Sequence, residues 1–302
     1  MILDTNYLMP IIIMLYVFLS ICCSVVVSVL LKLAKRYHID VFQAITWNYS
    51  MAILLTWIFF KPQLSINFAD APIYNYIALG ILFPSLFVIM ASSVRLAGIV
   101  RTDVAQRLSL FIPIFAAFFI FNEAKDTVKI IGIVLAFIAI ICSIPWQKAS
   151  RDKAAKISWI YLLIVFLGFG IIDVLLKQIT KVNKVPFTSA IFVIFILAFV
   201  LSMIGLIYQV ATKKTKFSWP HILIGWILGV ANFGNILFYL KAHQALANSP
   251  SAVFSSMNIG VIIVGTFIGI FIFKEKLSTL NKIGIVVAIL AIVVIYFPQL
   301  FN

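Results

Sequence analysis

The amino-acid sequence predicts an all-α integral membrane protein with ten transmembrane helices, arranged as two inverted repeats of five helices each. Composition is the first observation: 64% of the 302 residues are hydrophobic and 11% are charged, whereas soluble domains are about 45–50% apolar and about 25% charged. The mean hydropathy of +1.17 agrees with this. The second observation is a series of ten long apolar segments, and the third is an internal repeat. Together they disfavour a soluble enzyme, a nucleic-acid-binding domain, a secreted disulfide scaffold and a disordered chain.

Ten apolar segments, separated by short polar interruptions, make up most of the chain. A helix needs about 20 apolar residues to cross the hydrocarbon core, whereas the strands of a membrane β-barrel alternate at period two over about ten residues. The first segment follows eight residues without Lys or Arg, so we expect a retained helix rather than a cleaved signal peptide. The predicted spans are residues 9–31, 41–60, 73–94, 99–121, 127–146, 157–180, 186–211, 219–241, 248–273 and 279–298.

The net charge of +14 comes mostly from Lys and Arg in the short connections between these segments, where basic residues set the orientation of helices. We therefore expect the lipid bilayer, and not nucleic acid, as the charged partner. The longest polar stretch lies near the midpoint and divides the chain into a first repeat (residues 1–146), a basic linker (147–156) and a second repeat (157–302). The three cysteines lie inside apolar segments without metal-ligand spacing, and we expect no metal and no cofactor.

The last segments of the two halves repeat one another. At an offset of 152 residues, the stretch 123–144 aligns with 275–296, and at an offset of 145 residues Val29–Lys32 aligns with Val174–Lys177. Apolar composition alone does not readily place a Glu, a Thr and a Gly in register. An odd number of spans in each unit inverts the second copy, as in many secondary transporters. The polar and glycine pairs of the longer match are Glu123/Glu275, Thr127/Thr279 and Gly132/Gly284.

Asn122–Gly132 and Phe273–Gly284 each contain a Glu, a short turn and a Gly that opens an apolar helix. In this they resemble the EamA-like family of the drug/metabolite transporter superfamily, and Lys32 and Lys177, which end the first helix of each half, fit the same pattern. The resemblance implies ten helices, as two inverted five-helix repeats around a central cavity. Many relatives have an Arg in the second helix, at the position of Asn48 in this chain. A substrate preference that depends on that Arg therefore cannot be inferred for this chain.

The orientation of the helices stays open between two expectations. Lys and Arg are more numerous in the connections after the odd-numbered segments than in those after the even-numbered segments. By the positive-inside rule this favours both termini on the outer face. The family resemblance implies that both termini lie in the cytoplasm.

Charged residues inside spans are functional candidates, because a charge at a helix centre costs about 2.5–3.5 kcal/mol on insertion scales. Asp103 and Arg107 are four residues apart in the fourth span and share a helix face, so we expect an ion pair. Arg107 would bind a carboxylate or phosphate group of a substrate; the alternative is a pair that fixes the helix or reaches an interface. Asp173 and Lys177 have the same spacing in the sixth span. Lys241 could face the cavity or extend toward the membrane surface.

Polar uncharged side chains gather in the later spans. Asn232, Asn235 and Tyr239 form a stripe on one face of the eighth span, and Asn258 adds an amide to the ninth. Such groups can bind a zwitterion or a sugar, or can join one helix to another. We take these four residues, together with Asn48, Arg107 and Lys241, as candidate substrate-binding residues.

Glu123 and Glu275 each stand where an apolar segment ends and a basic turn begins. A structural role at a helix end is therefore expected, rather than a role in carrying protons. The first span contains no acidic residue between its ends. This disfavours the exchange of protons for cationic drugs that small multidrug exporters of the wider superfamily perform with a Glu at that place.

We therefore expect a secondary transporter that moves a small polar or anionic metabolite, such as an amino acid or an organic acid, by alternating access. The expected location is the inner membrane of a bacterium. One alternative is a membrane binding or scaffold protein without transport activity. An intramembrane enzyme is a further alternative, but it would need clustered acids or histidines, and His38, His221 and His243 are far apart in the sequence. A polar cavity at the middle of the membrane distinguishes a transporter from a scaffold.

Overall fold

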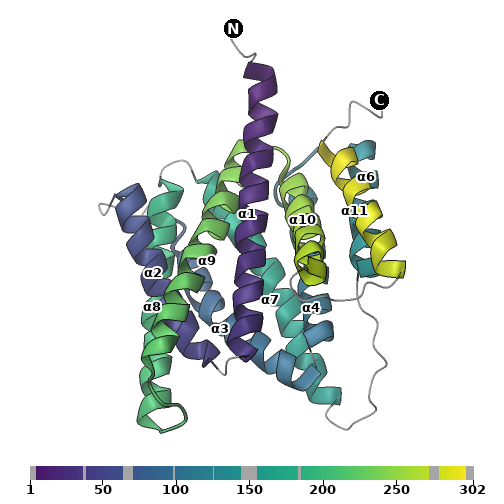
Figure 1. Cartoon of the computed structure of the whole chain (residues 1–302). Helices are drawn as coiled ribbons and strands as arrows, with labels where there is room; N and C mark the ends of the chain where they lie inside the picture. The colour runs from purple at the N-terminus through teal and green to yellow at the C-terminus, as the bar shows by residue number, and fades with distance from the viewer. Residues whose placement is uncertain are drawn as a thin grey trace.

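The computed structural model describes residues 5–36, 39–63, 71–97, 99–124, 126–143, 155–182, 185–271 and 279–296. Within these ranges the regular structure is entirely α-helical (Figure 1). The helices are α1 (Thr5–Arg36), α2 (Val41–Phe60), α3 (Ile73–Ala97), α4 (Ile99–Leu108), α5 (Phe111–Phe119), α6 (Thr127–Ser143), α7 (Ala155–Lys181), α8 (Phe187–Ala211), α9 (Trp219–Ala245), α10 (Pro250–Phe271) and α11 (Thr279–Tyr296).

Each of the ten predicted apolar segments forms helix, with ends that differ from the predicted ones by a few residues. Five helices in the described ranges, α3, α7, α8, α9 and α10, are both long and apolar enough to cross a membrane. Parts of α1, α4 with α5, α6 and α11 are apolar over shorter lengths. α2 belongs to neither group because Gln43, Thr46, Asn48 and Ser50 lower its hydropathy. The basic linker at 147–156 lies almost wholly outside the described residues.

The predicted fourth span is not one continuous helix, which corrects the prediction for residues 99–121. α4 ends at Leu108 and α5 begins at Phe111. Pro113 has no N–H, so it cannot bond the carbonyl oxygen of Ser109 four residues earlier. That oxygen instead accepts a bond of 3.0 Å from the Ile112 N–H. The chain therefore makes a tighter turn at this point, near the middle of the bundle.

The helices form a bundle in which successive long elements run in alternating directions (Figure 1). α1 begins and α11 ends at the same end of the bundle, the upper end in Figure 1. The largest helix pairs join the first half (α1–α6) to the second (α7–α11): α6 with α11, α2 with α9 and α8, α1 with α9 and α10, and α3 with α7 and α8. The two halves therefore interdigitate, because most helices of each half pack against helices of the other half.

Most of these pairs occur twice, with the halves exchanged. When α4 and α5 are taken together as the fourth helix of the first half, α1 with α9 corresponds to α7 with α3, and α2 with α9 corresponds to α8 with α3. Likewise α1 packs on α10, and α4 and α5 pack on α7. The fifth helices, α6 and α11, pack on each other through fully buried alanines. These alanines are two aligned pairs of the sequence repeat, Ala136/Ala288 and Ala139/Ala291.

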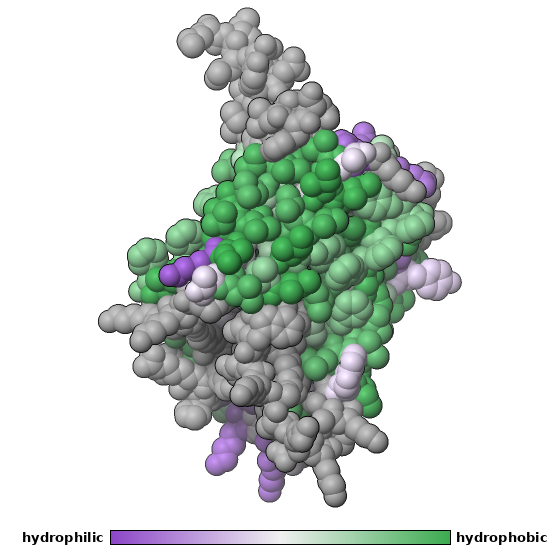
Figure 2. Space-filling model, turned by 90° about the vertical axis from the view of Figure 1, so that its right-hand side faces the viewer, coloured by the Kyte–Doolittle hydropathy of each residue, from purple (hydrophilic) through white to green (hydrophobic). Residues whose placement is uncertain are grey.

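The described residues on the face of the bundle seen in Figure 2 are mostly hydrophobic. α6 exposes Ile131 and Val134, and α11 exposes Ile283, Val286 and Ile289, each about half accessible. In water such a continuous apolar surface would be unstable, whereas in a bilayer it contacts lipid tails. The surface therefore agrees with an integral membrane protein.

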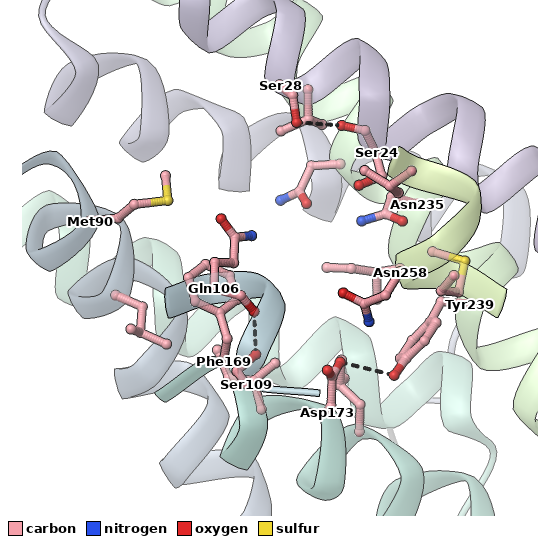
Figure 3. A pocket seen from close by; sticks show the side chains of 18 of the residues that line it. Ser24, Ser28, Met90, Gln106, Ser109, Phe169, Asp173, Asn235, Tyr239 and Asn258 are labelled. Atoms are coloured by element: carbon pink, nitrogen blue, oxygen red, sulfur yellow. Dashed lines mark hydrogen bonds between the residues drawn. The ribbon is translucent and has the colours of Figure 1, made fainter. Parts of the chain in front are cut away.

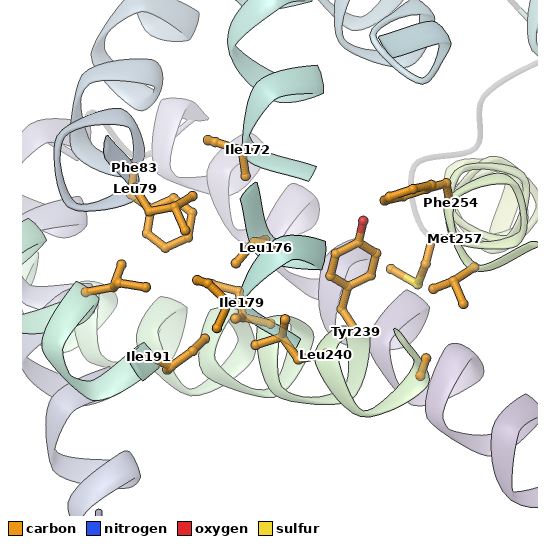
Figure 4. Packing of buried hydrophobic residues seen from close by; sticks show 14 of the residues in the cluster. Leu79, Phe83, Ile172, Leu176, Ile179, Ile191, Tyr239, Leu240, Phe254 and Met257 are labelled. Atoms are coloured by element: carbon orange, nitrogen blue, oxygen red, sulfur yellow. The ribbon is translucent and has the colours of Figure 1, made fainter. Parts of the chain in front are cut away.

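Buried apolar side chains from most of the helices form the main core, and Figure 4 shows the part of it that α3, α7, α8, α9 and α10 contribute. Leu79, Ile179 and Leu240 are fully or almost fully buried at its centre. The core lies beside the polar residues described below and holds α7 and α9 in a fixed relation. That relation determines which side chains of the two helices can meet.

α9 approaches α2 closely at two glycines. A methyl group on Gly225 would lie 2.6 Å from the carbonyl oxygen of Ala44, and one on Gly229 would lie 2.6 Å from that of Asn48. The two glycines are four residues apart, a small-residue spacing that lets helix backbones approach closely. A methyl group on Gly265, by contrast, would meet nothing within 4 Å in the described part of the chain.

At the lower end of the bundle in Figure 1, Asp40 joins α2 to the connection between α8 and α9. Its carboxylate accepts hydrogen bonds from the backbone N–H groups of Phe42 and Gln43, which caps α2, and from the hydroxyl of Thr215. Partial burial alone would raise the pKa of Asp40, but these hydrogen bonds lower it below its ordinary value. The cap therefore stabilises the fold above that ordinary pKa and is lost as the pH falls through the lower folded-state value.

We expect Gly229→Ala to destabilise the protein, because the added methyl group must push α9 away from the backbone of α2. Overpacking of this kind typically costs about 1–3 kcal/mol. Gly265→Ala is the matched control, with the same chemical change in open space. Thermal unfolding in detergent should show a lower midpoint for Gly229→Ala and an unchanged or higher midpoint for Gly265→Ala. Equal midpoints for the two variants would contradict the described packing.

Candidate functional site

A cavity of about 280 Å³ lies between α1, α3, α4, α7, α9 and α10. Figure 3 shows polar side chains from several helices pointing into it. Asn232 to Tyr239 in α9 and Met257 to Val261 in α10 line it from near the middle of their helices. In a membrane-spanning bundle this position corresponds to the hydrocarbon centre, where polar groups are rare and mark solute pathways.

α9 presents the predicted polar stripe to this cavity. Asn232, Asn235 and Tyr239 all line it, as their spacing of three and four residues on a helix requires. The Asn235 amide oxygen accepts a 2.9 Å hydrogen bond from the hydroxyl of Ser20 on α1. The same hydroxyl lies 2.9 Å from the Asn235 backbone oxygen. Asn235 is therefore held in place by α1 while its amide NH₂ group remains a hydrogen-bond donor.

α7 contributes a carboxylate to the cavity wall. Asp173 accepts a 2.9 Å hydrogen bond from the hydroxyl of Tyr239 (Figure 3). Among the described residues that line the cavity, Asp173 is the single acidic residue. A carboxylate with one hydrogen bond retains further acceptor positions, so Asp173 can receive a donor from a solute.

α4 contributes a cation and an amide. Arg107 and Gln106 line the cavity in the last turn of α4, and Ser109 lines it where the helix ends. The Ser109 hydroxyl donates to the Gln106 carbonyl oxygen, which closes the turn. The side chain of Asp103, predicted to pair with Arg107, lies outside the described residues. Arg107 and Asp173 thus place opposite charges on different walls of one cavity.

The rest of the wall is partly polar and partly apolar. Asn258 of α10 faces the cavity and donates a 3.1 Å hydrogen bond to the Phe254 carbonyl oxygen of its own helix. Phe83 and Met90 of α3 and Phe169 of α7 form apolar parts of the surface. The arrangement suits a small solute that has both charged ends and an apolar body.

Three predicted roles do not fit the structure. Asp173 and Lys177 do not form an ion pair: the Lys177 ammonium donates instead to the carbonyl oxygens of His243, at 2.9 Å, and Ala247, at 3.4 Å. Lys177 is nearest the end of α9, where free carbonyl groups attract a cation. Lys241 does not line the cavity, because its ammonium lies over the rings of Tyr16 and Phe60.

Asn48 also lies outside the cavity. Its side chain is almost fully buried where α2 meets α9, and neither its amide oxygen nor its nitrogen has a hydrogen-bond partner in the described part of the chain. The position of Asn48 follows from the close contact with Gly229. The structure therefore places it in the packing between helices.

Polar bonds join four elements above the cavity, toward the upper end in Figure 1. Glu123, in the connection between α5 and α6, accepts hydrogen bonds from the Ser251 backbone N–H at 2.9 Å and from the Ser251 hydroxyl at 2.6 Å. Ser251 is in the first turn of α10, whose free N–H groups need acceptors. Lys177 interacts electrostatically with Glu123. We name Glu123, Lys177, Ser251 and the backbone carbonyl group of His243 the upper clamp. Glu275 lies outside the described residues.

An aromatic layer separates the cavity from the upper clamp. The rings of Tyr239 and His243 lie 4.6 Å apart, centre to centre, and those of His243 and Phe254 lie 4.7 Å apart. His243 is fully buried, and neither of its ring nitrogens has a hydrogen-bond partner among the described residues. The three rings of Tyr239, His243 and Phe254 therefore pack together next to the cavity, which Tyr239 lines.

Sequence reasoning did not select Ser24, Ser28 and Gln106, which line the cavity. Ser20, Ser24 and Ser28 recur every four residues in the first apolar segment, and this regular spacing marks one polar helix face. Gln106 is adjacent to Arg107 and has no distinguishing pattern in the sequence.

A second cavity, of about 580 Å³, lies between α5 and α7. All of its described lining residues are apolar, including Phe115, Phe166 and Leu175. Phe115 and Phe119 are largely exposed at its rim. This cavity offers no hydrogen bond to a polar solute, so the mid-bundle cavity is the candidate site.

Comparisons with known proteins agree with this geometry. Residues 156–297 match the model of the EamA-like transporter family. An uncharacterized protein of Haemophilus influenzae is 43% identical over 286 residues, which cover 92% of this chain and 96% of that protein. A solved crystal structure is similar over 95% of this chain and 98% of its own, with a TM-score of 0.74 and 11% sequence identity. At that identity, the likeness concerns the fold alone.

We expect Glu123→Ala to lower stability, because it leaves a buried N–H and a buried hydroxyl of Ser251 without their acceptor. Leaving such groups unsatisfied typically costs about 1–3 kcal/mol each. Ser251→Ala removes the hydroxyl alone and should cost less. Thr127→Ala, at an exposed position nearby, is the control. Thermal unfolding in detergent checks the order, and a Glu123→Ala midpoint equal to that of the control would contradict the role of the clamp.

Proposed function

Because this chain belongs to the EamA-like transporter family, we propose that it transports a small zwitterionic metabolite, of the amino-acid class, across the membrane by alternating access. The family is a family of membrane transporters, and the chain is an integral, multi-pass membrane protein. The single observation on which the choice of substrate depends is the presence of Arg107 and Asp173 in one mid-bundle cavity.

The chemistry of the cavity supports a solute with two opposite charges. The guanidinium group of Arg107 matches a carboxylate in geometry and charge. Asp173 matches an ammonium group, and Tyr239 orients its carboxylate. An organic acid without an ammonium group would leave Asp173 without a cationic partner, so the acid on α7 favours a zwitterion over a simple anion.

The amides and the apolar wall support the same class. Asn232, Asn235 and Asn258 supply uncharged donors and acceptors between the two charged residues. Phe83, Met90 and Phe169 supply an apolar surface for a side chain. A volume of about 280 Å³ admits a small molecule rather than a peptide or a lipid.

The packing of the helices supports two inverted repeats and alternating access. Helix pairs between the halves recur with the halves exchanged, and the aligned alanines of α6 and α11 meet each other. Both are expected when two equivalent units of opposite orientation are related by a two-fold axis in the membrane plane. The break between α4 and α5 at Ser109 agrees with transporters whose binding sites use discontinuous helices. In this proposal, a rocking motion of the halves closes one side of the cavity as the other opens.

The substrate class is tested by thermal unfolding of the purified protein with each of the twenty proteinogenic amino acids, because a solute that binds the folded state raises its stability. At 100 times Kd this stabilisation is about 2.7 kcal/mol. For an amino acid that raises the midpoint, its amide, which lacks the carboxylate, and its 2-oxo acid, which lacks the ammonium group, should give no shift. A 2-oxo acid that stabilises as well as the amino acid would overturn the zwitterion proposal.

We expect Arg107→Ala to reduce uptake of the stabilising amino acid into proteoliposomes at least tenfold, because the carboxylate loses its charged partner. A tenfold loss corresponds to about 1.4 kcal/mol of binding free energy. Lys241→Ala is the matched control, since it also removes a cation but lies outside the cavity. Its uptake should stay within about twofold of the wild type. Equal losses for the two variants would remove Arg107 from the site.

A further inference from the structure

We propose that Asp173 is also a proton-binding residue, which exchanges a proton for the ammonium group of the substrate and so couples transport to a proton gradient. Tyr239 and His243 would form the path by which that proton reaches the upper end of the bundle. This inference rests on the proposed function and adds the coupling ion and its site.

The position of Asp173 is the first support. It is the single acidic residue among the described residues that line the mid-bundle cavity, and Tyr239 is its one hydrogen-bonded protein partner there. No cation in the described part of the chain is bonded to it, so this carboxylate has two stable partners within a membrane, a proton or a cationic group of a solute. The two compete for the same oxygen atoms, so binding of one displaces the other.

The charges around Asp173 are distributed unevenly. α4 presents Arg107 across the cavity, and α9 presents Tyr239 and His243. α3 contributes Tyr76, while α5 and α8 have no charged side chain. On α7 itself Lys177, one helical turn nearer the upper end, is bonded to the backbone oxygens of His243 in α9 and of Ala247 just after it, with Lys181 beyond it. None of these cations is bonded to Asp173, which leaves its carboxylate available.

His243 is the second group on the proposed proton path. It follows Tyr239 by one helical turn on α9, and the two rings lie 4.6 Å apart. His243 is fully buried, yet neither ring nitrogen has a hydrogen-bond partner in the described ranges. Burying an imidazole ring whose nitrogens have no hydrogen-bond partner costs free energy. Here it lies between the cavity and the upper clamp, where chains of acidic and histidine side chains conduct protons in other membrane proteins.

Atoms and charge are conserved in the proposed exchange of a proton for the substrate ammonium group. In the solute-free state the Asp173 carboxyl group holds one proton. When the substrate enters, the carboxyl O–H bond breaks, the ammonium N–H donates to the carboxylate oxygen, and the proton passes through the Tyr239 hydroxyl and a ring nitrogen of His243 to water at the upper end. One proton therefore leaves for each zwitterion bound, and the carboxylate keeps one positive partner throughout.

The decisive experiment measures proton release by the wild-type protein. The amino acid that stabilises the purified protein most is titrated calorimetrically in two buffers with different ionisation enthalpies, at several values between about pH 5 and 9. The proposal expects up to one proton released per molecule bound, with an affinity that falls as the pH is lowered. Binding without proton release throughout this range would overturn it. Absence of any binding would instead overturn the proposed function.

Proteoliposomes test the two residues separately. Exchange of labelled for unlabelled amino acid needs no gradient, whereas accumulation driven by a pH gradient needs coupling. Asp173→Asn, which can neither hold nor release the proton, should show weaker exchange that no longer depends on pH, and its gradient-driven accumulation should fall at least tenfold. His243→Gln should retain exchange and lose most of the gradient-driven part, and Lys241→Ala should retain both. If Asp173→Asn accumulated the amino acid with the gradient dependence of the wild type, Asp173 would not be the proton site. If His243→Gln did so, His243 would not be on the proton path.

Discussion

A polar side chain in the hydrocarbon core of a membrane must bond to another protein group or face water, and most of this structure follows from that constraint. The upper clamp satisfies it by bonding: Lys177 donates to carbonyl oxygens at the end of α9, and Glu123 accepts from the start of α10. The cavity leaves room for water or a solute beside Arg107, Asp173 and the amides. The upper clamp and the cavity lie next to each other along the same helices. The clamp joins the helices, and the cavity is the candidate binding site.

The same helices therefore connect the site to one end of the bundle. Asp173 and Lys177 are one turn apart on α7, and Tyr239 and His243 are one turn apart on α9. A change at the cavity that moves α7 relative to α9 must alter the bonds of the upper clamp. In the proposed mechanism, occupation of the site would be linked in this way to closure at that end, as alternating access requires.

Sequence patterns predicted much of the fold and part of the site. Long apolar segments determine helices almost without regard to context, so the element boundaries agree closely, and the stripe of Asn232, Asn235 and Tyr239 does line the cavity. Helix spacing could not show which neighbour a charged residue meets. Lys177 is four residues from Asp173, but the packing of α7 against α9 gives it backbone partners instead. The break in the fourth span depends on Pro113, a residue that many membrane helices tolerate without a break.

Labelling of the cavity from each side of the membrane tests the central claim most directly. In a variant without Cys22, Cys23 and Cys142, a single cysteine replaces Ser24, a cavity-lining residue of α1. Membrane-impermeant thiol reagents are then applied to either face of oriented proteoliposomes. The account predicts modification from both faces, with substrate and pH shifting reactivity from one face to the other. Modification from one face alone under all of these conditions would contradict a mid-membrane cavity that opens alternately to the two sides.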